Sequence, residues 1–172
     1  MPLELTGERV LLRPLRPEEL EVLAAGLIDA TSSPGARDRL RRRVARSGRF
    51  LDGHLDLAIE AGGELAGEVS ARQPAAALPA GVFELGISLL EGRRGRGYGT
   101  DAISVLTGHL FARMGAERVQ GSTDVANLAM RRVFERLGFA EEGVMRAFMP
   151  AAGGRADYVL YGVTRAEWLT RD

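Results

Sequence analysis

A glycine- and arginine-rich stretch near the middle of the chain has the residue types of an anion site, Arg94-Gly95-Arg96-Gly97-Tyr98-Gly99-Thr100. Residues 82–90 before it carry apolar side chains in period two, which predicts a buried strand. The spacing of apolar residues after it predicts one face of a helix, formed by Ile103, Leu106, Leu110 and Met114 and ended by Gly115. Glycines let the backbone approach a ligand, and the first N–H groups of a helix have no acceptor within the helix. The stretch therefore predicts a site for a phosphate or pyrophosphate.

The kind of phosphate ligand is narrowed by what the chain lacks. All 23 basic residues are arginine, so the lysine that a P-loop nucleotide site requires is absent. A dinucleotide fingerprint survives only in relaxed form, as Gly97, Gly99 and Ala102, with Asp124 as a ribose partner. Such a domain would need further strand and helix units after this one, and the remaining chain is short. The third candidate is the pyrophosphate of coenzyme A, and a plain glycine turn is the structural alternative.

The rest of the chain must position this loop, and its periodicity predicts a strand, two helices, three strands, a helix, a strand, a helix and two strands. The first strand is expected at 8–13, and the two helices start at Pro17 and at Ser33-Pro34. A hairpin is expected to turn at Ala61-Gly62-Gly63. The later elements are expected at 118–123, 127–137, 139–149 and 156–163.

Several segments in order resemble the GNAT superfamily of acyl-CoA N-acyltransferases. The loop 94–99 is similar to that family's Arg/Gln-x-x-Gly-x-Gly/Ala motif, and Asn127 through Phe139 with Glu142-Gly143 resembles its RimJ/RimL branch, the ribosomal-protein-type N-terminal amine acetyltransferases. Residues 5–14, 154–161 and Glu167-Trp168 are similar to the first strand and the ending of that branch. The resemblance covers nearly the whole chain and is weakest between about residues 24 and 49.

The resemblance implies an α/β (α+β) fold in which residues 1–172 form one N-acetyltransferase domain. Its mixed, mostly antiparallel sheet is expected to have six to seven strands that splay at the centre, with helices on both faces. An unbroken strand ladder is the alternative that the sequence leaves open.

Acetyl-CoA is the co-substrate that the resemblance implies. In the family, backbone groups corresponding to Leu89 and Leu90 align the pantetheine arm, and an N–H near Ser88 or Leu89 polarises the thioester carbonyl. The loop that binds the pyrophosphate corresponds to Arg94, Gly95, Arg96, Gly97, Tyr98, Gly99 and Thr100. Asn127 corresponds to a residue that holds a ligand amide or a water, although asparagine also suits a helix N-cap. Arg132 would either reach a phosphate of CoA or lie exposed on its helix.

Direct attack of an amine on the thioester is the reaction that the resemblance implies. Glu84 matches the acidic residue of the branch and is the expected base, acting directly or through water, with an exposed strand glutamate as the alternative. An α-amine, with a pKa near 8, asks less of a base than a lysine amine near 10.4. Phe134 and Met130 stand where relatives often have tyrosine and serine, and neither can protonate the departing thiolate. Transfer would then proceed without a general acid, or Tyr98, Tyr158 or water would supply the proton.

The composition of the chain excludes some other kinds of chemistry. It has no cysteine, which excludes transfer through an enzyme thioester, and only two histidines, His54 and His109, so no metal site is expected. The basic segment Arg37–Arg49 is either a solvated face or a surface for an acidic peptide or ribosomal RNA. With no long apolar run and no signal-peptide pattern, a cytoplasmic enzyme is expected. A monomer and a homodimer are both compatible with the sequence. A small-amine acetyltransferase and a non-catalytic acyl-CoA sensor remain alternatives.

Overall fold

The computed structural model describes residues 1–28 and 32–171 and consists of a mixed eight-stranded sheet flanked by helices. The strand order is β1-β2-β3-β4-β5-β6-β8-β7, and all neighbours are antiparallel except β5 and β6. The strands are β1 Leu5–Thr6, β2 Leu11–Arg13, β3 His54–Ala61, β4 Glu64–Arg72, β5 Val82–Leu89, β6 Arg118–Asp124, β7 Ala140–Ala151 and β8 Gly154–Thr164. The helices are the 3-10 turn η1 Pro17–Glu19, α1 Leu20–Leu27, α2 Ala36–Arg46, α3 Tyr98–Arg113, α4 Leu128–Arg136 and α5 Arg165–Thr170.

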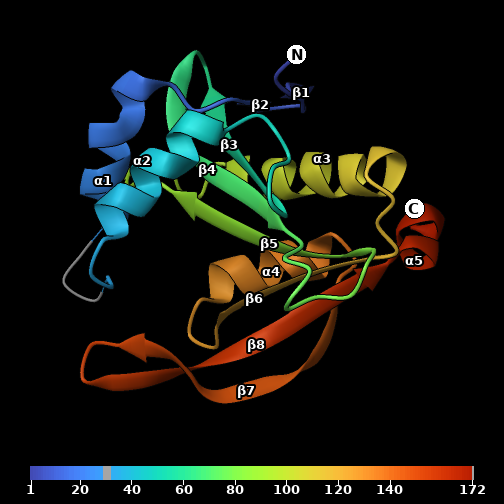
Figure 1. Cartoon of the computed structure of the whole chain (residues 1–172). Coiled ribbons are helices and arrows are strands. Elements are labelled where there is room, and N and C mark those ends of the chain that lie inside the picture. Colours follow the sequence, from blue (N-terminus) through green and yellow to red (C-terminus); the bar gives the residue numbers. More distant parts are fainter. Residues whose placement is uncertain (29–31, 172) are drawn as a thin grey trace.

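Helices cover both faces of the sheet (Figure 1). On one face α3, α4 and α5 enclose the main core, in which Phe83, Ile103 and Tyr161 are almost fully buried. On the other face α1 and α2 enclose a smaller core built on Leu23, Leu40 and their neighbours. The second core covers only part of that face, which leaves room beside it for a cleft.

The predicted elements occur in the predicted order, but the sequence did not predict β1 or the C-terminal helix α5. Because of β1, the sheet has eight strands and not six to seven. The first strand is also shorter than predicted, because residues 7–10 form a turn that is bound by a helix. The carboxylate of Asp101 in α3 accepts hydrogen bonds from the backbone N–H groups of Glu8, Arg9 and Val10. This contact fixes the first turn of α3 against the start of the sheet.

The two central strands, β5 and β6, are hydrogen-bonded over only the first part of their length. β5 and β6 pair in parallel from Val82 with Arg118 to Leu85 with Gly121, and no further pairs follow. β5 nevertheless continues to pair with β4 as far as Leu89, and β6 with β8 as far as Asp124. The expected splay at the centre of the sheet is therefore confirmed, and it opens between residues 86–89 and 122–124.

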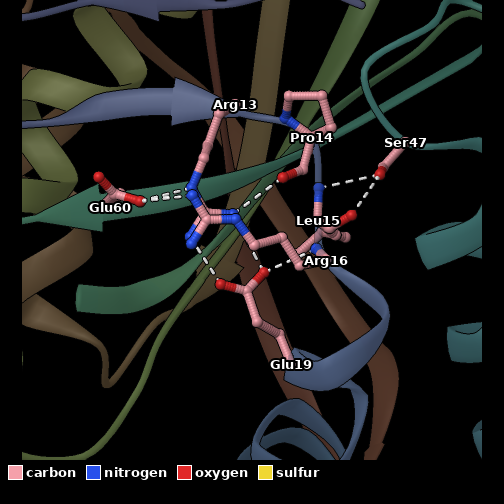
Figure 2. A network of polar contacts seen from close by, with 7 residues as sticks. All are labelled: Arg13, Pro14, Leu15, Arg16, Glu19, Ser47 and Glu60. Carbon is pink, nitrogen blue, oxygen red and sulfur yellow. Dashed lines mark hydrogen bonds and ion pairs between the residues drawn. The ribbon is translucent and has the colours of Figure 1, made fainter. Parts of the chain in front are cut away.

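A buried arginine fixes the chain where it leaves the sheet for the first helices (Figure 2). The side chain of Arg13, 4% exposed, donates to Glu60 of β3 at 2.5 Å and to Glu19 of η1 at 2.6 Å. Ser47, just after α2, accepts from the backbone N–H of Leu15 at 2.9 Å. Together these bonds link the start of α1 and the end of α2 to the sheet.

The last two strands form a long hairpin that extends beyond the helices (Figure 1). Its register shifts between Met145 and Met149, where three residues bulge out of β7. Asp157 accepts from the backbone N–H of Ala147 at 2.7 Å, and Arg155 donates to the carbonyl oxygens of Ala147 and Phe148. The bulge is thus held in one shape, and Phe148 pairs with the ring of Tyr158 at 5.7 Å.

Candidate active site

The loop before α3 has the backbone of an anion site. Gly95 and Gly97 adopt positive φ values of 72° and 81°, which favour glycine, and Gly97 caps α3. At the start of α3, the backbone N–H groups of residues 97–100 have no backbone acceptor in the described part of the chain. Four free donors at a helix N-terminus attract a negatively charged group, and the positive end of the helix dipole adds to this.

This loop forms one wall of a cleft of about 680 Å³, here called the loop cleft. Helix α4 forms the facing wall, and the open end of β5 forms the floor. Its lining brings together most of the residues predicted to bind the co-substrate: Ser88, Leu89, Arg94, Gly95, Gly97, Tyr98, Gly99, Thr100, Asn127 and Arg132. Arg132 is exposed and has no hydrogen bond or ion pair with another described residue.

Two of the residues predicted to bind the co-substrate, Leu90 and Arg96, do not line the loop cleft. Leu90 is outside the lining, and its backbone N–H donates to the carbonyl oxygen of Ala66 in the β4 segment at 2.9 Å. Because the backbone groups of an antiparallel strand alternate in direction, those of Leu89 point the other way, into the gap beside β6. The side chain of Arg94 reaches the Leu89 carbonyl oxygen at 3.3 Å from that side. Arg96 lines a neighbouring hollow with Arg9 and Arg136.

Asn127 has the helix-capping role that the sequence left open, and it also lines the loop cleft. Its side-chain oxygen accepts from the backbone N–H of Met130 at 3.2 Å. The side-chain amide nitrogen has no acceptor among the residues described, so the same residue can donate to a ligand.

A second cleft, of about 920 Å³, lies beside α2 on the polar face of β3, β4 and β5. It is called the arginine cleft here, because Arg39, Arg42, Arg43, Arg46 and Arg72 line it. The bulge of β7 contributes Phe148 and Met149, and β8 contributes Tyr158. The two clefts share Ile87 and Ser88, which lie where β5 has parted from β6.

Glu84 lies on the floor of the arginine cleft and faces away from the core, as its period-two position predicts. Its neighbours Phe83 and Leu85 are buried on the other face. The Glu84 carboxylate forms an ion pair with Arg72 across the β4–β5 pair and is within 3.5 Å of the amide of Gln120. Ser88 is four positions further along the strand, which corresponds to roughly 13 Å.

A second carboxylate, which the sequence analysis did not single out, lies much closer to Ser88. Glu68 of β4 is the direct cross-strand partner of Ser88 and is 7% exposed on the floor of the arginine cleft. Burial raises the pKa of Glu68 above its ordinary value, and the Arg43 guanidinium at 2.7 Å offsets only part of this effect. The alternation of side chains along the strand could have indicated this position, because Val69 beside Glu68 is apolar and buried on the opposite face.

Glu68 belongs to a network that ties α2 to the sheet. Arg43 also donates to Asp56 of β3 at 2.8 Å, and Arg46 reaches the other oxygen of Asp56 at 3.3 Å. Asp56 is 3% exposed, so its charge is balanced by these two guanidinium groups within a largely buried network. Nearby, burial lowers the pKa of His54, and the positive charge of Arg46 adds to that effect.

The residues that depart from the family's usual types occupy different places. Phe134 is 2% exposed and stacks on Tyr161 at 5.1 Å, with its ring tip against Gly121, where β5 and β6 separate. Met130 lines the loop cleft. Of the tyrosines considered as proton donors, Tyr98 lines the loop cleft and Tyr158 the arginine cleft.

Comparison with known proteins decides between the ligand classes that this geometry allows. The family model described as an acetyltransferase (GNAT) domain matches residues 9–140. The chain belongs to the GNAT acetyltransferases. The dinucleotide alternative is thereby set aside, because the co-substrate of this family is acetyl-CoA.

The resemblance to the GNAT superfamily is confirmed, and the proteins that share this fold include RimJ and RimL. Bacillus subtilis YdaF, whose assignment as a ribosomal N-acetyltransferase is itself provisional, is 28% identical, with 94% of each chain covered. The structure of Mycobacterium smegmatis RimJ with CoA-disulfide has a TM-score of 0.78 at 22% identity and covers 99% of this chain and 91% of its own. The apo structure of RimL, the ribosomal L7/L12 α-N-protein acetyltransferase, has a TM-score of 0.76 at 20% identity, with 95% of each chain covered.

No three His, Cys, Asp or Glu side chains within 1–28 and 32–171 are grouped so that they could hold a metal ion. None of the helices in those ranges is long and apolar enough to cross a membrane.

Proposed function

We propose that this acetyltransferase transfers the acetyl group of acetyl-CoA directly to the α-amine of a protein or peptide. The observation that carries the proposal is the meeting of two clefts at Ile87 and Ser88. One cleft has the unpaired backbone donors that suit a pyrophosphate, and the other is open to an acceptor of peptide size. Both volumes lie within the range usual for ligand sites.

In this proposal the co-substrate lies in the loop cleft. The N–H groups of Gly95, Gly97, Tyr98, Gly99 and Thr100 donate to the pyrophosphate, with Arg94, Arg96 and Arg132 nearby to offset its charge. Ser88 and Leu89 border the open gap beside β6, where a pantetheine arm can pair with the backbone in place of the missing strand contact. The Asn127 amide is available to hold a ligand carbonyl or a water.

The acceptor amine enters from the arginine cleft. A carboxylate takes one proton from the ammonium group, the neutral nitrogen forms the C–N bond, and the C–S bond breaks to release the CoA thiolate. The nitrogen then loses its second proton, and the thiolate takes one up, from Tyr98, Tyr158 or water. Glu84 is the base that the sequence predicts, and Glu68 is the carboxylate directly opposite Ser88.

The preference for an α-amine rests on its pKa, which is lower than that of a lysine side chain. At neutral pH about a tenth of an α-amine is already the free base, whereas a lysine amine is almost wholly protonated. A carboxylate that is ion-paired with arginine is a weaker base, and deprotonating an α-amine demands less of it than deprotonating a lysine side chain. Glu84 is paired with Arg72, and Glu68 is paired with Arg43.

The proposal is tested by release of free thiol from acetyl-CoA with three acceptors. These are a peptide with a free α-amine, the same peptide with a blocked N-terminus and one internal lysine, and spermidine. We expect turnover with the first alone. Equal turnover with spermidine would favour the small-amine alternative, and binding of acetyl-CoA without any thiol release would favour a non-catalytic sensor.

A further inference from the structure

The arginine cleft carries more positive than negative charge. Five guanidinium groups line it, against the three carboxylates of Asp56, Glu68 and Glu84. His54 adds no charge at neutral pH, because burial and the neighbouring Arg46 lower its pKa. A ligand that enters this cleft therefore meets a net positive field.

The carboxylates of the cleft are already matched by arginines. Asp56 and Glu68 are held by Arg43 and Arg46, while Glu84 is paired with Arg72. These ion pairs leave Arg39 and Arg42 as the arginines of the lining without a carboxylate partner in the described chain. Arg39 bonds to Ser33 and to the carbonyl oxygen of Pro34, whereas Arg42 has no hydrogen bond or ion pair with a described residue.

The remaining arginines of the basic segment are arranged differently. Arg37 is paired with Glu21 of α1, and Arg41 with Asp38 one turn earlier in α2. Neither lines the cleft, and neither does the exposed Arg49. The segment is therefore a solvated face in part, and only the side of α2 that faces the cleft can act on a substrate.

Building on the proposed function, we infer that the acceptor is a peptide N-terminus with acidic side chains in its first few residues, which Arg39 and Arg42 recognise. The cleft-lining part of α2, from Arg39 to Arg46, spans about 10 Å at 1.5 Å per residue. An extended peptide covers that length with about three residues. Carboxylates on those residues can pair with the two guanidinium groups while the amine reaches Ser88.

A peptide fits this cleft better than a nucleic acid does. The wall opposite α2 presents Phe148, Met149 and Tyr158, which offer apolar contact to peptide side chains. These three side chains carry no positive charge that could bind phosphate groups on that side of the cleft. A polyamine, which is cationic along its whole length, would be repelled by the same arginines that attract an acidic peptide.

The test uses three peptides that share an N-terminal serine and continue with two aspartates, two alanines or two lysines. KM and kcat are measured by thiol release for the wild type, for Arg42→Glu and for Arg49→Glu. Arg49 is a matched control, because it is an exposed arginine of the same segment that lies outside the cleft. Fluorescence anisotropy of labelled peptides in the presence of CoA measures binding separately, so a failure of catalysis is distinguished from a failure of recognition.

We expect the aspartate peptide to have a KM about tenfold below that of the alanine peptide, and the lysine peptide the highest KM. Arg42→Glu should abolish the preference by raising the KM for the aspartate peptide, whereas Arg49→Glu should preserve both the preference and the activity of the wild type. Raising the salt concentration should reduce the preference. Equal binding of the three peptides by the wild type would overturn the inference. A duplex RNA that binds more tightly than the aspartate peptide, and loses binding in Arg42→Glu, would overturn it in favour of nucleic acid.

Discussion

A β-carbon on Gly67 would lie 2.2 Å from the carbonyl oxygen of Ser88 and 2.9 Å from the Cα of Leu89. Glycine is needed there because the backbones of β4 and β5 approach closely beside the splay, and both neighbouring atoms belong to the main chain. The position of the β5 segment that borders both clefts therefore depends on a missing side chain in the neighbouring strand.

Replacing that glycine should impair catalysis more than folding. We expect Gly67→Ala to shift Ser88 and Leu89 by several tenths of an ångström and to lower kcat at least tenfold, since a misplaced reacting group is costly. The measurement is kcat by thiol release together with the melting temperature. Gly108→Ala is the control, because it lies in α3 with no atom within 4 Å of the added methyl. That change should stabilise the fold by about 0.5–1 kcal/mol and leave kcat unchanged.

The identity of the proton acceptor can be determined from the pH dependence of kcat/KM. If Glu68 is the base, activity should fall as the pH drops through its raised pKa, because the carboxylate becomes protonated. Glu68→Gln should then lower kcat/KM and remove this fall of activity at low pH, called the acid limb of the profile. Glu84→Gln should keep the acid limb. The opposite result would identify Glu84 as the base.

Asp56→Asn is the matched control for the glutamine variant of Glu68. Asp56 is equally buried and shares Arg43 with Glu68, so its loss disturbs the same ion-pair network. A variant that lowers the melting temperature without removing the acid limb would mark the network as structural. Loss of the limb in Asp56→Asn as well would argue against a direct role for Glu68.

The buried arginine network should make the fold sensitive to acid. Burial tends to raise the pKa of Glu19, but hydrogen bonds from Arg13 and from the Arg16 backbone lower it below the usual 4.5 overall. A lowered pKa in the folded state stabilises the protein above pH 4.5, and this contribution is lost as the pH falls through the folded value.

Glu19→Gln tests this linkage. At pH 7 we expect a loss of about 1–3 kcal/mol in the free energy of unfolding, since Arg13 stays buried with Glu60 as its remaining carboxylate partner. The difference from wild type should shrink below pH 4.5. Urea unfolding at pH 7 and at lower pH measures it, and a constant difference across that range would contradict the assignment.

The ring of Phe134 leaves no space at Gly121 of β6. An added β-carbon would lie 2.6 Å from the ring tip, and that ring is itself packed against Phe139 and Tyr161. We expect Gly121→Ala to destabilise the protein by about 1–3 kcal/mol, measured by urea unfolding. Adding Phe134→Leu should recover part of the loss. If the double variant is no better than Gly121→Ala, the ring is not the cause.

The sequence predicted those parts of the site that depend on local patterns. The glycine loop, the following helix and the outward direction of Glu84 all follow from spacing along one segment. The cluster of Glu68, Asp56 and Arg43 could not be predicted in the same way, because three separate elements bring these residues together. Alternation in β3 and β4 assigns both carboxylates to the outer face, but only the cross-strand register puts Glu68 opposite Ser88.

The gap between β5 and β6 could not be predicted from the local sequence pattern either. Nothing in the alternating pattern of residues 82–90 reveals that pairing with β6 stops at Leu85. The expectation of a splay came from family resemblance, and the structure confirmed it. The distribution of the arginines along α2 also depended on the fold, because Glu21 and Asp38 neutralise some of them while others face the cleft.

The two clefts have separate linings and share only Ile87 and Ser88. If acetyl-CoA and the acceptor bind in these two clefts as proposed, neither has to pass through the other's cleft, so either can bind first. Steady-state kinetics should follow a random sequential scheme, with double-reciprocal lines that intersect to the left of the vertical axis. Desulfo-CoA should compete with acetyl-CoA and act as a mixed inhibitor toward the peptide.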